Sequence, residues 1–158
     1  MSANIQIKLL ANCPEHIPAL AQLWLDELGA KWIPNASTER ATEVYKEHLN
    51  TNDLPMTFVM VDSDKPIGMV SLRDNDGIRE DLTPWLGSLI VHPDYRRKGL
   101  GEMLINVTMQ RCKAMGYKKL YLFALDPALP AWYKELGWKE IGEDKLYHHP
   151  VTAMEILV

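Results

Sequence analysis

The chain has 158 residues and a formal net charge of −4, with 47% hydrophobic and 24% charged residues. This balance is typical of a soluble globular protein, and the negative charge disfavours a general nucleic-acid binder, which would be basic. Two cysteines, Cys13 and Cys112, are too few for a disulfide scaffold; we expect Cys112 to be a small core residue and Cys13, before Pro14 at a helix start, to be structural. We predict one domain over residues 1–158.

The N-terminal stretch MSANIQIKLLANCPEH lacks the apolar core of a signal peptide. The chain also has no run of about 18 apolar residues, so no membrane-spanning helix is expected. We therefore expect a cytoplasmic protein with no membrane partner.

The first third of the chain predicts a strand and two helices. Residues 5–11 alternate in polarity, which is typical of a strand. Residues 14–29 place apolar side chains at helical spacing, and Gly29 suits a C-terminal cap for that helix. The same spacing predicts a second helix over about residues 38–49.

The middle of the chain predicts three strands and a long helix. Residues 56–61 and 67–72 form a hairpin pattern around the turn DSDKP. Residues 85–91 predict a buried strand, and its central Gly87 is typical of a bulge or of a close approach by another group. A helix is predicted over residues 100–115, ending at a glycine.

The last part predicts a strand over residues 118–125, a short helix ending at Gly137, and two closing strands. Residues 85–125 then form a strand–helix–strand unit, which should be a right-handed parallel crossover. The element order indicates an α/β fold whose sheet is partly antiparallel and partly parallel.

The stretch VHPDYRRKGLGEMLI, residues 91–105, combines basic side chains, two glycines and a helix start. The first N–H groups of a helix lack internal partners, and the helix dipole adds partial positive charge there. Gly99 and Gly101 would let an anion approach this backbone closely, which makes the stretch a candidate phosphate cradle. The alternative is a basic helix N-terminus that follows a glycine-rich turn and binds nothing.

The spacing of the glycines narrows the kinds of phosphate-containing ligand that this cradle could bind. A dinucleotide fingerprint needs a third glycine, and Leu104 stands in that place. The Gly-Lys-Ser/Thr of a P-loop is absent as well. What remains is Arg-x-x-Gly-x-Gly, formed by Arg96, Gly99 and Gly101.

Two segments together resemble the GNAT superfamily of acetyl-CoA-dependent N-acetyltransferases. LTPWLGSLIVHPDYRRKGLGEMLI is similar to that family's central strand, pyrophosphate loop and following helix, and DPALPAWYKELGWKEIG is similar to its later helix. The resemblance implies a GNAT-like fold with a mixed sheet of about six to seven strands flanked by about four helices. It also implies a splayed parallel strand pair that holds acetyl-CoA, and it allows a homodimer, since family members are often dimers.

The resemblance also implies which residues hold the cofactor. The backbone of residues 96–101 would bind the pyrophosphate, and the strand at residues 89–91 would pair with the pantetheine arm. Many family members have an Asn where this chain has Asp126, which can accept hydrogen bonds but cannot donate them when ionised. The expected cofactor-binding residues are Leu89, Ile90, Val91, Arg96, Arg97, Lys98, Gly99, Leu100, Gly101, Glu102 and Asp126.

Tyr133 stands where the family commonly places a Tyr near the CoA sulfur, so it is the candidate catalytic acid. The alternative is a core Tyr on a short helix. The base stays open, because the strand at residues 85–91 carries no carboxylate. The candidates are Glu80, Asp81, His92, or a water chain to Ser88 or to a backbone carbonyl.

The expected reaction is acetyl transfer to a primary amine, which could be a small amine, an aminoglycoside-like polyamine or a protein N-terminus. Trp32 and Ile33, between the first two helices, either pack over the core edge or line a substrate mouth. A non-catalytic acyl-CoA-binding module is the second interpretation, and a nucleotide- or phosphate-sugar-binding enzyme the third. The histidines are not spaced as metal ligands, so no metal is expected. Acidic residues that could form a cation-favouring mouth are Asp26, Glu39, Glu43, Asp74, Asp76 and Asp81.

Overall fold

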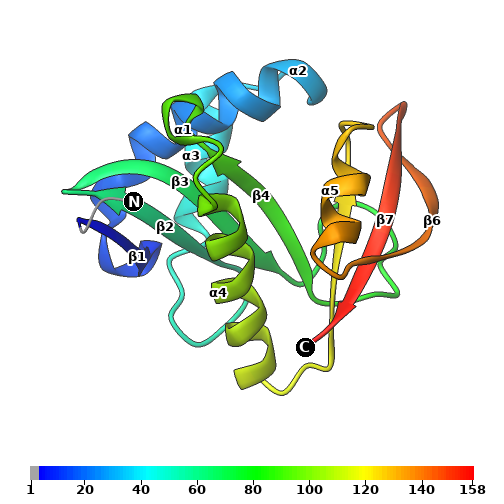
Figure 1. The fold of residues 1–158 in the computed structure, drawn as a ribbon. Coiled ribbons are helices and arrows are strands. Elements are labelled where there is room, and N and C mark those ends of the chain that lie inside the picture. Colours follow the sequence, from blue (N-terminus) through cyan, green and yellow to red (C-terminus); the bar gives the residue numbers. More distant parts are fainter. Residues whose placement is uncertain (1–3) are drawn as a thin grey trace.

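The computed structural model describes residues 4–158, so the first three residues of the predicted domain lie outside the described part. These residues form a seven-stranded sheet in the order β1-β2-β3-β4-β5-β7-β6 (Figure 1). Neighbouring strands are antiparallel except β4 and β5, which run parallel. The strands are β1 Ile5–Leu9, β2 Met56–Asp62, β3 Lys65–Arg73, β4 Trp85–Val91, β5 Lys119–Ala124, β6 Lys139–Leu146 and β7 His149–Leu157.

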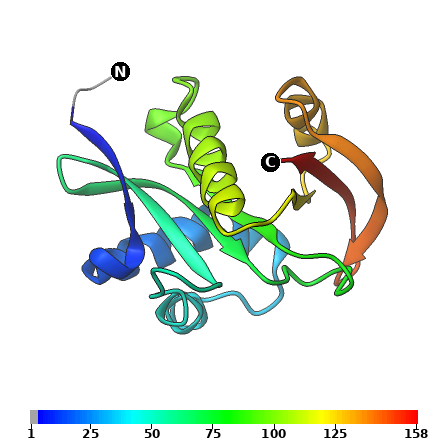
Figure 2. The same cartoon turned by 90° about the horizontal axis from the view of Figure 1, so that it is seen from below.

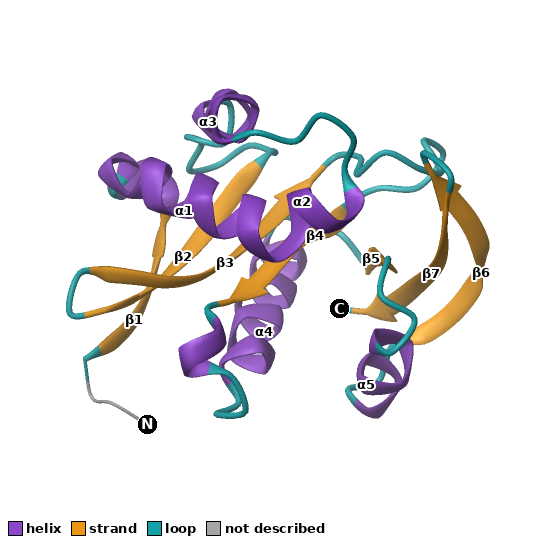
Figure 3. Cartoon of the chain, turned by 90° about the horizontal axis from the view of Figure 1, so that it is seen from above, coloured by secondary structure: helices purple, strands orange, loops and turns teal. Residues whose placement is uncertain are grey.

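Helices cover both faces of this sheet. Figures 2 and 3 show α1, α2 and α3 on one face, and α4 and α5 on the other. The predicted α/β fold class with a parallel pair at its centre is therefore confirmed. None of the helices in the described chain is long and apolar enough to cross a membrane. The helices are α1 Ile17–Trp24, α2 Ala30–Trp32, α3 Thr38–Lys46, α4 Leu100–Ala114 and α5 Leu129–Glu135.

The central strands are apolar on both faces because both faces are covered. Along β2, Phe58 and Met60 pack into the core under α4, whereas Val59 and Val61 pack into the core under α1 and α3. Both cysteines are buried, as predicted for Cys112, and burial raises the pKa of the Cys112 thiol to about 11.

The prediction that Gly29 ends the first helix is wrong. Helical structure continues from α1 through a π-helical turn, Leu25–Gly29, into α2, and Gly29 has an ordinary helical φ of −60°. A Cβ at this position would lie 2.5 Å from ring atom Cζ3 of Trp24. The glycine therefore makes room for an indole ring and does not cap the helix.

Strands β4 and β5 pair at a single position, Trp85 opposite Tyr121. The pairing of β3 with β4 shifts between Gly87 and Ile90, so β4 contains an extra residue and bulges there. Ser88, inside the bulge, has a φ of +49°. Gly87, which was predicted to mark a bulge, thus lies at a bulge. Beyond Trp85 the two parallel strands β4 and β5 diverge.

A buried polar chain ties the end of α3 to β2 and β3. The Nδ1 atom of His48 lies 2.8 Å from the Thr57 hydroxyl, which lies 2.7 Å from the Ser71 hydroxyl. All three residues are buried, and burial lowers the pKa of His48 to about 3. His48 is therefore neutral in the folded protein at physiological pH.

We predict that acid destabilises the fold through His48. The unfolded chain protonates this histidine near pH 6.5 and the folded protein only near pH 3, so stability is fully present above 6.5 and is lost as pH falls below it. Between pH 7 and pH 5 this linkage lowers the free energy of unfolding by about 2 kcal/mol. Urea denaturation of the wild type at both pH values should show this loss of stability, and the His48→Gln variant should not show it. Equal losses in the two proteins would contradict the assignment.

Candidate active site

The divergence of β4 from β5 opens a cleft of about 900 Å³. Figure 3 shows the two diverging parts of the sheet, with β4 on one side and β5, β7 and β6 on the other. The N-terminus of α4 and the helix α5 line one end of the cleft, and α2, α3 and the β6–β7 turn line the other. We call the first the donor end and the second the acceptor end, and the volume is ordinary for a ligand site.

Two glycines shape the donor end. Gly99 is the N-cap of α4 and has a φ of +77°, a conformation that residues with a side chain adopt only with strain. At Gly101 a Cβ would meet the Trp132 ring at 3.4 Å. Both glycines line the cleft, where the first N–H groups of a 15-residue helix are open to a ligand.

The three basic side chains predicted around this cradle lie in different places. Arg96 donates to the Val91 carbonyl at 3.0 Å and to Glu27 at 2.6 Å, so its guanidinium is already bonded to the protein. Lys98 lies over the Tyr95 ring at 5.5 Å and does not line the cleft. Arg97 lines the cleft and forms no hydrogen bond or ion pair with other described residues. Of the three, Arg97 is the one that lines the cleft with its guanidinium free of partners among the described residues.

The other predicted cofactor residues line the same cleft. Because β4 loses its partner after Trp85, no strand pairs with its β5 side along residues 89–91, although the Val91 carbonyl accepts a hydrogen bond from Arg96. Asp126 accepts a hydrogen bond from the Ala128 N–H at 2.9 Å just before α5 begins. The predicted residues that line the cleft are Leu89, Ile90, Val91, Arg96, Arg97, Gly99, Leu100, Gly101, Glu102 and Asp126.

Tyr133 lies in the cleft wall on α5 and is only 6% exposed. Its ring packs between those of Trp132 and Trp138, at centroid distances of 5.0 and 6.0 Å. No described residue hydrogen-bonds its hydroxyl. Burial raises the Tyr133 pKa, so the hydroxyl stays protonated at neutral pH. Tyr133 is therefore a core residue whose side chain also lines the cleft.

None of the three named base candidates lines the cleft. Glu80 is exposed, and Asp81 forms an ion pair with Arg79 at 2.9 Å. The His92 Nδ1 accepts a hydrogen bond from the Asp94 N–H at 3.1 Å in the turn after β4. Ser88, considered as the end of a water chain, does line the cleft.

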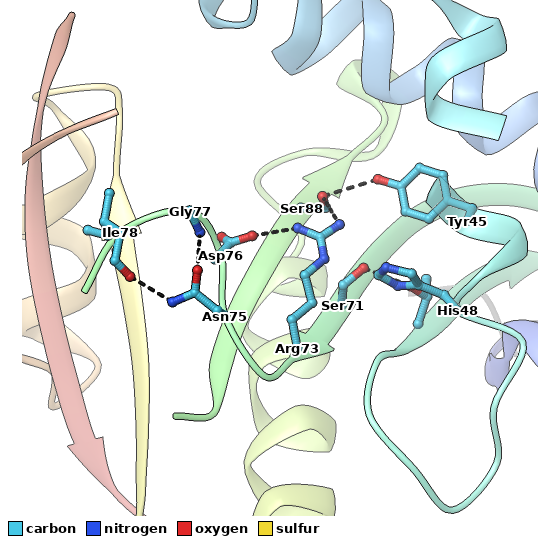
Figure 4. Close-up of polar contacts among 10 residues, drawn as sticks. Tyr45, His48, Ser71, Arg73, Asn75, Asp76, Gly77, Ile78 and Ser88 are labelled. Carbon is cyan, nitrogen blue, oxygen red and sulfur yellow. Dashed lines mark hydrogen bonds and ion pairs between the residues drawn. The ribbon is translucent and has the colours of Figure 1, made fainter. Parts of the chain in front are cut away.

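Sequence reasoning missed a polar network in the acceptor end (Figure 4). The Arg73 guanidinium donates to the Asp76 carboxylate at 2.6 Å and to the Ser88 hydroxyl at 3.0 Å. The Tyr45 hydroxyl donates to the same Ser88 oxygen at 3.1 Å. All four residues line the cleft, and the signal that could have found them is Gly87, whose missing side chain leaves room for the ion pair.

The charges in this network depend on one another. Burial raises the pKa of Asp76, and the neighbouring Arg73 charge opposes that rise. Burial, the largest single influence, would lower the pKa of Arg73, but the interactions with Asp76 and Tyr45 together outweigh it and the net direction is upward. Burial likewise raises the pKa of Tyr45, which stays a neutral donor. A charged pair beside two hydroxyls is thus built into the wall of the cleft.

Comparison with known proteins identifies the family. The model of the acetyltransferase (GNAT) family matches residues 17–138. The chain belongs to this family, as the two sequence segments predicted. Among the residues that the structure describes, no group of three His, Cys, Asp or Glu is placed to hold a metal.

Individual relatives agree with this assignment. An amino-acid acetyltransferase of Azotobacter vinelandii is 30% identical over 93 residues, which is 52% of this chain and 21% of that protein. The chain spans 21% or less of the length of the first curated relatives it matches. Among solved structures, an aminoglycoside 6′-N-acetyltransferase complexed with coenzyme A superposes with a TM-score of 0.76 at 18% identity over 96% of both chains. Arabidopsis thaliana NAA60 in complex with acetyl-CoA gives 0.73 at 15% identity over 98% of both. At these identities the two structures show the shared GNAT fold.

We predict that Gly87→Ala destabilises this GNAT protein by about 1–3 kcal/mol through overpacking. The new Cβ would lie 2.7 Å from Asp76 Oδ2 and 2.8 Å from Arg73 Nη1, so the ion pair would have to move. Urea denaturation measures the loss. In an Asp76→Ala background the same glycine substitution should cost less, and additive costs in this double-mutant cycle would contradict the contact.

Proposed function

We propose that this chain transfers the acetyl group of acetyl-CoA to a primary amine by direct attack of the amine on the thioester. The observation that carries the proposal is the cleft beyond the single β4–β5 pair, with an open strand edge in one wall and a glycine-capped helix N-terminus at one end. These two features suit a ligand that has both an amide-bearing arm and a pyrophosphate. Family membership supports the same donor.

The residues present fit acetyl-CoA. Backbone N–H groups at the start of α4 and the free Arg97 side chain would hold the pyrophosphate. The open edge of β4 at residues 89–91 would hydrogen-bond the pantetheine amides, as an added strand would. Asp126 would accept a hydrogen bond from an amide N–H of the same arm.

The chemistry requires three proton movements. In the attack, the amine nitrogen bonds to the carbonyl carbon, and the bond from that carbon to sulfur breaks. An alkylamine with a pKa of about 10.4 is almost wholly protonated at pH 7, and making it neutral costs roughly 4–5 kcal/mol. The proton that the ammonium loses would go to solvent. Tyr133, buried and protonated in the cleft wall, would give its proton to the departing thiolate, and the proton that the attacking nitrogen loses would restore the Tyr133 hydroxyl.

A second candidate function is a non-catalytic acyl-CoA-binding module. It is favoured by the lack of a carboxylate in β4 and by the position of Glu80, Asp81 and His92 outside the cleft. Thiol release from acetyl-CoA across a panel of small amines, aminoglycosides and peptide N-termini, with mass spectrometry of the products, separates the two. Acetylated product supports the enzyme, and tight binding without turnover on any amine supports the module.

We predict that Tyr133→Phe lowers kcat by about 10²–10⁴-fold, the usual contribution of a general acid. The ring and its packing remain, so the Kd for acetyl-CoA should stay within about twofold. Tyr117→Phe, at a residue outside the cleft, is the matched control and should behave as wild type. An unchanged kcat in Tyr133→Phe would remove this residue from the mechanism.

We also predict that two adjacent basic residues, Arg97 and Lys98, differ in their contribution to acetyl-CoA binding. Arg97→Ala should raise the Kd for acetyl-CoA by roughly 10-fold or more, the loss expected for a hydrogen bond to a charged group. Lys98→Ala should change it less than about twofold, because that side chain lies outside the cleft. Calorimetry measures both, with ATP and NAD as competing ligands that should bind at least about tenfold more weakly. Equal effects of the two variants, or tighter binding of ATP or NAD, would contradict the proposed donor site.

A further inference from the structure

We propose that the acceptor end of the cleft binds a monocationic amine with an apolar body, and that Asp76 Oδ2 takes its ammonium group. This inference rests on the proposed function and names the substrate class of the same site.

The placement of the carboxylates in the cleft singles out Asp76. Four carboxylate side chains line it among the described residues. Glu27 is paired with Arg96, Glu102 lies in the first turn of α4, and Asp126 precedes α5. Glu102 and Asp126 belong to the donor end, and Glu27 is tied there by Arg96 of the loop before α4, so Asp76, paired with Arg73, is the carboxylate at the acceptor end.

One oxygen of Asp76 remains available. Oδ1 accepts from Arg73 at 2.6 Å, whereas Oδ2 has no hydrogen-bond partner among residues 4–158. The Asp76 side chain is 14% exposed, and Oδ2 lies close against Gly87 on β4, two residues before the strand segment expected to hold the donor arm. An ammonium group on Oδ2 would therefore sit beside the reacting end of the donor.

The carboxylate is held firmly in this position. Arg73, which bonds Oδ1, is itself fixed by its second hydrogen bond to Ser88. The loop that carries Asp76 is closed by Asn75, which accepts from the Gly77 N–H and donates to the Ile78 carbonyl, both at 2.8 Å (Figure 4). Such support preorganises a binding group before the ligand arrives.

The rest of the acceptor end suits an apolar body and opposes a second cation. Its walls include the side chains of Trp32, Ile33 and Val44 from one half of the sheet and Tyr147 from the other. Besides the Arg73–Asp76 ion pair, the charged groups at this end are the exposed Lys31 and Arg40. Of the six acidic residues expected to form a cation-favouring mouth, only Asp76 lines the cleft. A second ammonium on the acceptor would meet like charges at the rim, which disfavours polyamines and aminoglycosides.

The first test compares hexylamine with 1,6-diaminohexane, which differ by one cationic end. With saturating acetyl-CoA, kcat/KM for hexylamine should be at least about tenfold higher. Arg40→Glu, an exposed substitution away from the core, should reduce this preference about tenfold by removing one rim cation and adding an anion. Preference for the diamine in the wild type, or an unchanged ratio in Arg40→Glu, would overturn the proposed substrate class.

The second test removes the charge at Asp76. Asp76→Asn should raise KM for hexylamine at least about tenfold with acetyl-CoA affinity unchanged. Asp74→Asn changes an exposed neighbour outside the cleft and should match wild type. Equal kinetics in the two variants would overturn the role of Asp76.

Failure of the proposed function would look different. If the wild type binds CoA but acetylates no amine, the transfer reaction is refuted. Calorimetry of hexylamine with the CoA-loaded protein then decides the inference by itself. The inference is supported if the wild type and Asp74→Asn bind hexylamine and Asp76→Asn does not. It is overturned if the wild type does not bind hexylamine.

Discussion

The divergence of two parallel strands is the constraint on which the rest of this structure depends. β4 and β5 share only the Trp85–Tyr121 position, because an extra residue in β4 at the bulge turns the strand away from its neighbour. Each strand keeps its other partner: β4 stays paired with β3, and β5 with β7. The divergence thus leaves the facing edges of both strands without a strand partner inside the cleft, while each strand stays paired on its other side.

Contacts around the single strand pair and at the acceptor end of the cleft hold the two halves together. The β3–β4 loop places Ile78 in a buried cluster with Trp85 and Tyr121, across the single strand pair. At the acceptor end the Trp32 ring contacts the His149 ring edge-on, at a centroid distance of 5.3 Å. The strand edge of β4 and the start of α4 lie at the donor end of the cleft, and the buried Arg73–Asp76 ion pair lies at the acceptor end.

Local patterns in the sequence predicted the donor end well. The β4 strand, the α4 helix and their glycine-rich connection are continuous in the chain, so periodicity and turn chemistry were enough to place them. The open edge at residues 89–91 and the position of Tyr133 followed from the family resemblance, and the structure brings them to one cleft. The roles of these residues in catalysis stay predictions.

The acceptor end could not be predicted in the same way. Tyr45 and Ser88 are 43 residues apart, and Arg73 and Ser88 are 15 apart, so they meet only through packing of the sheet and α3. The direction of side chains could not be predicted either, because nothing in the local sequence distinguishes Arg97, which lines the cleft, from Lys98, which does not. Gly29 was misjudged because a glycine suits a helix cap and a close contact equally well, and only the neighbouring Trp24 decides between them.

Hydrogen exchange with and without acetyl-CoA tests the central claim most directly, because it reports which backbone N–H groups the donor covers. Protection should increase at residues 89–91, along the open edge of β4, and at residues 96–101, where α4 begins. The amides of β1 and β2 should not change. Protection that appears away from the β4–β5 cleft, or no change at saturating acetyl-CoA, would contradict the account.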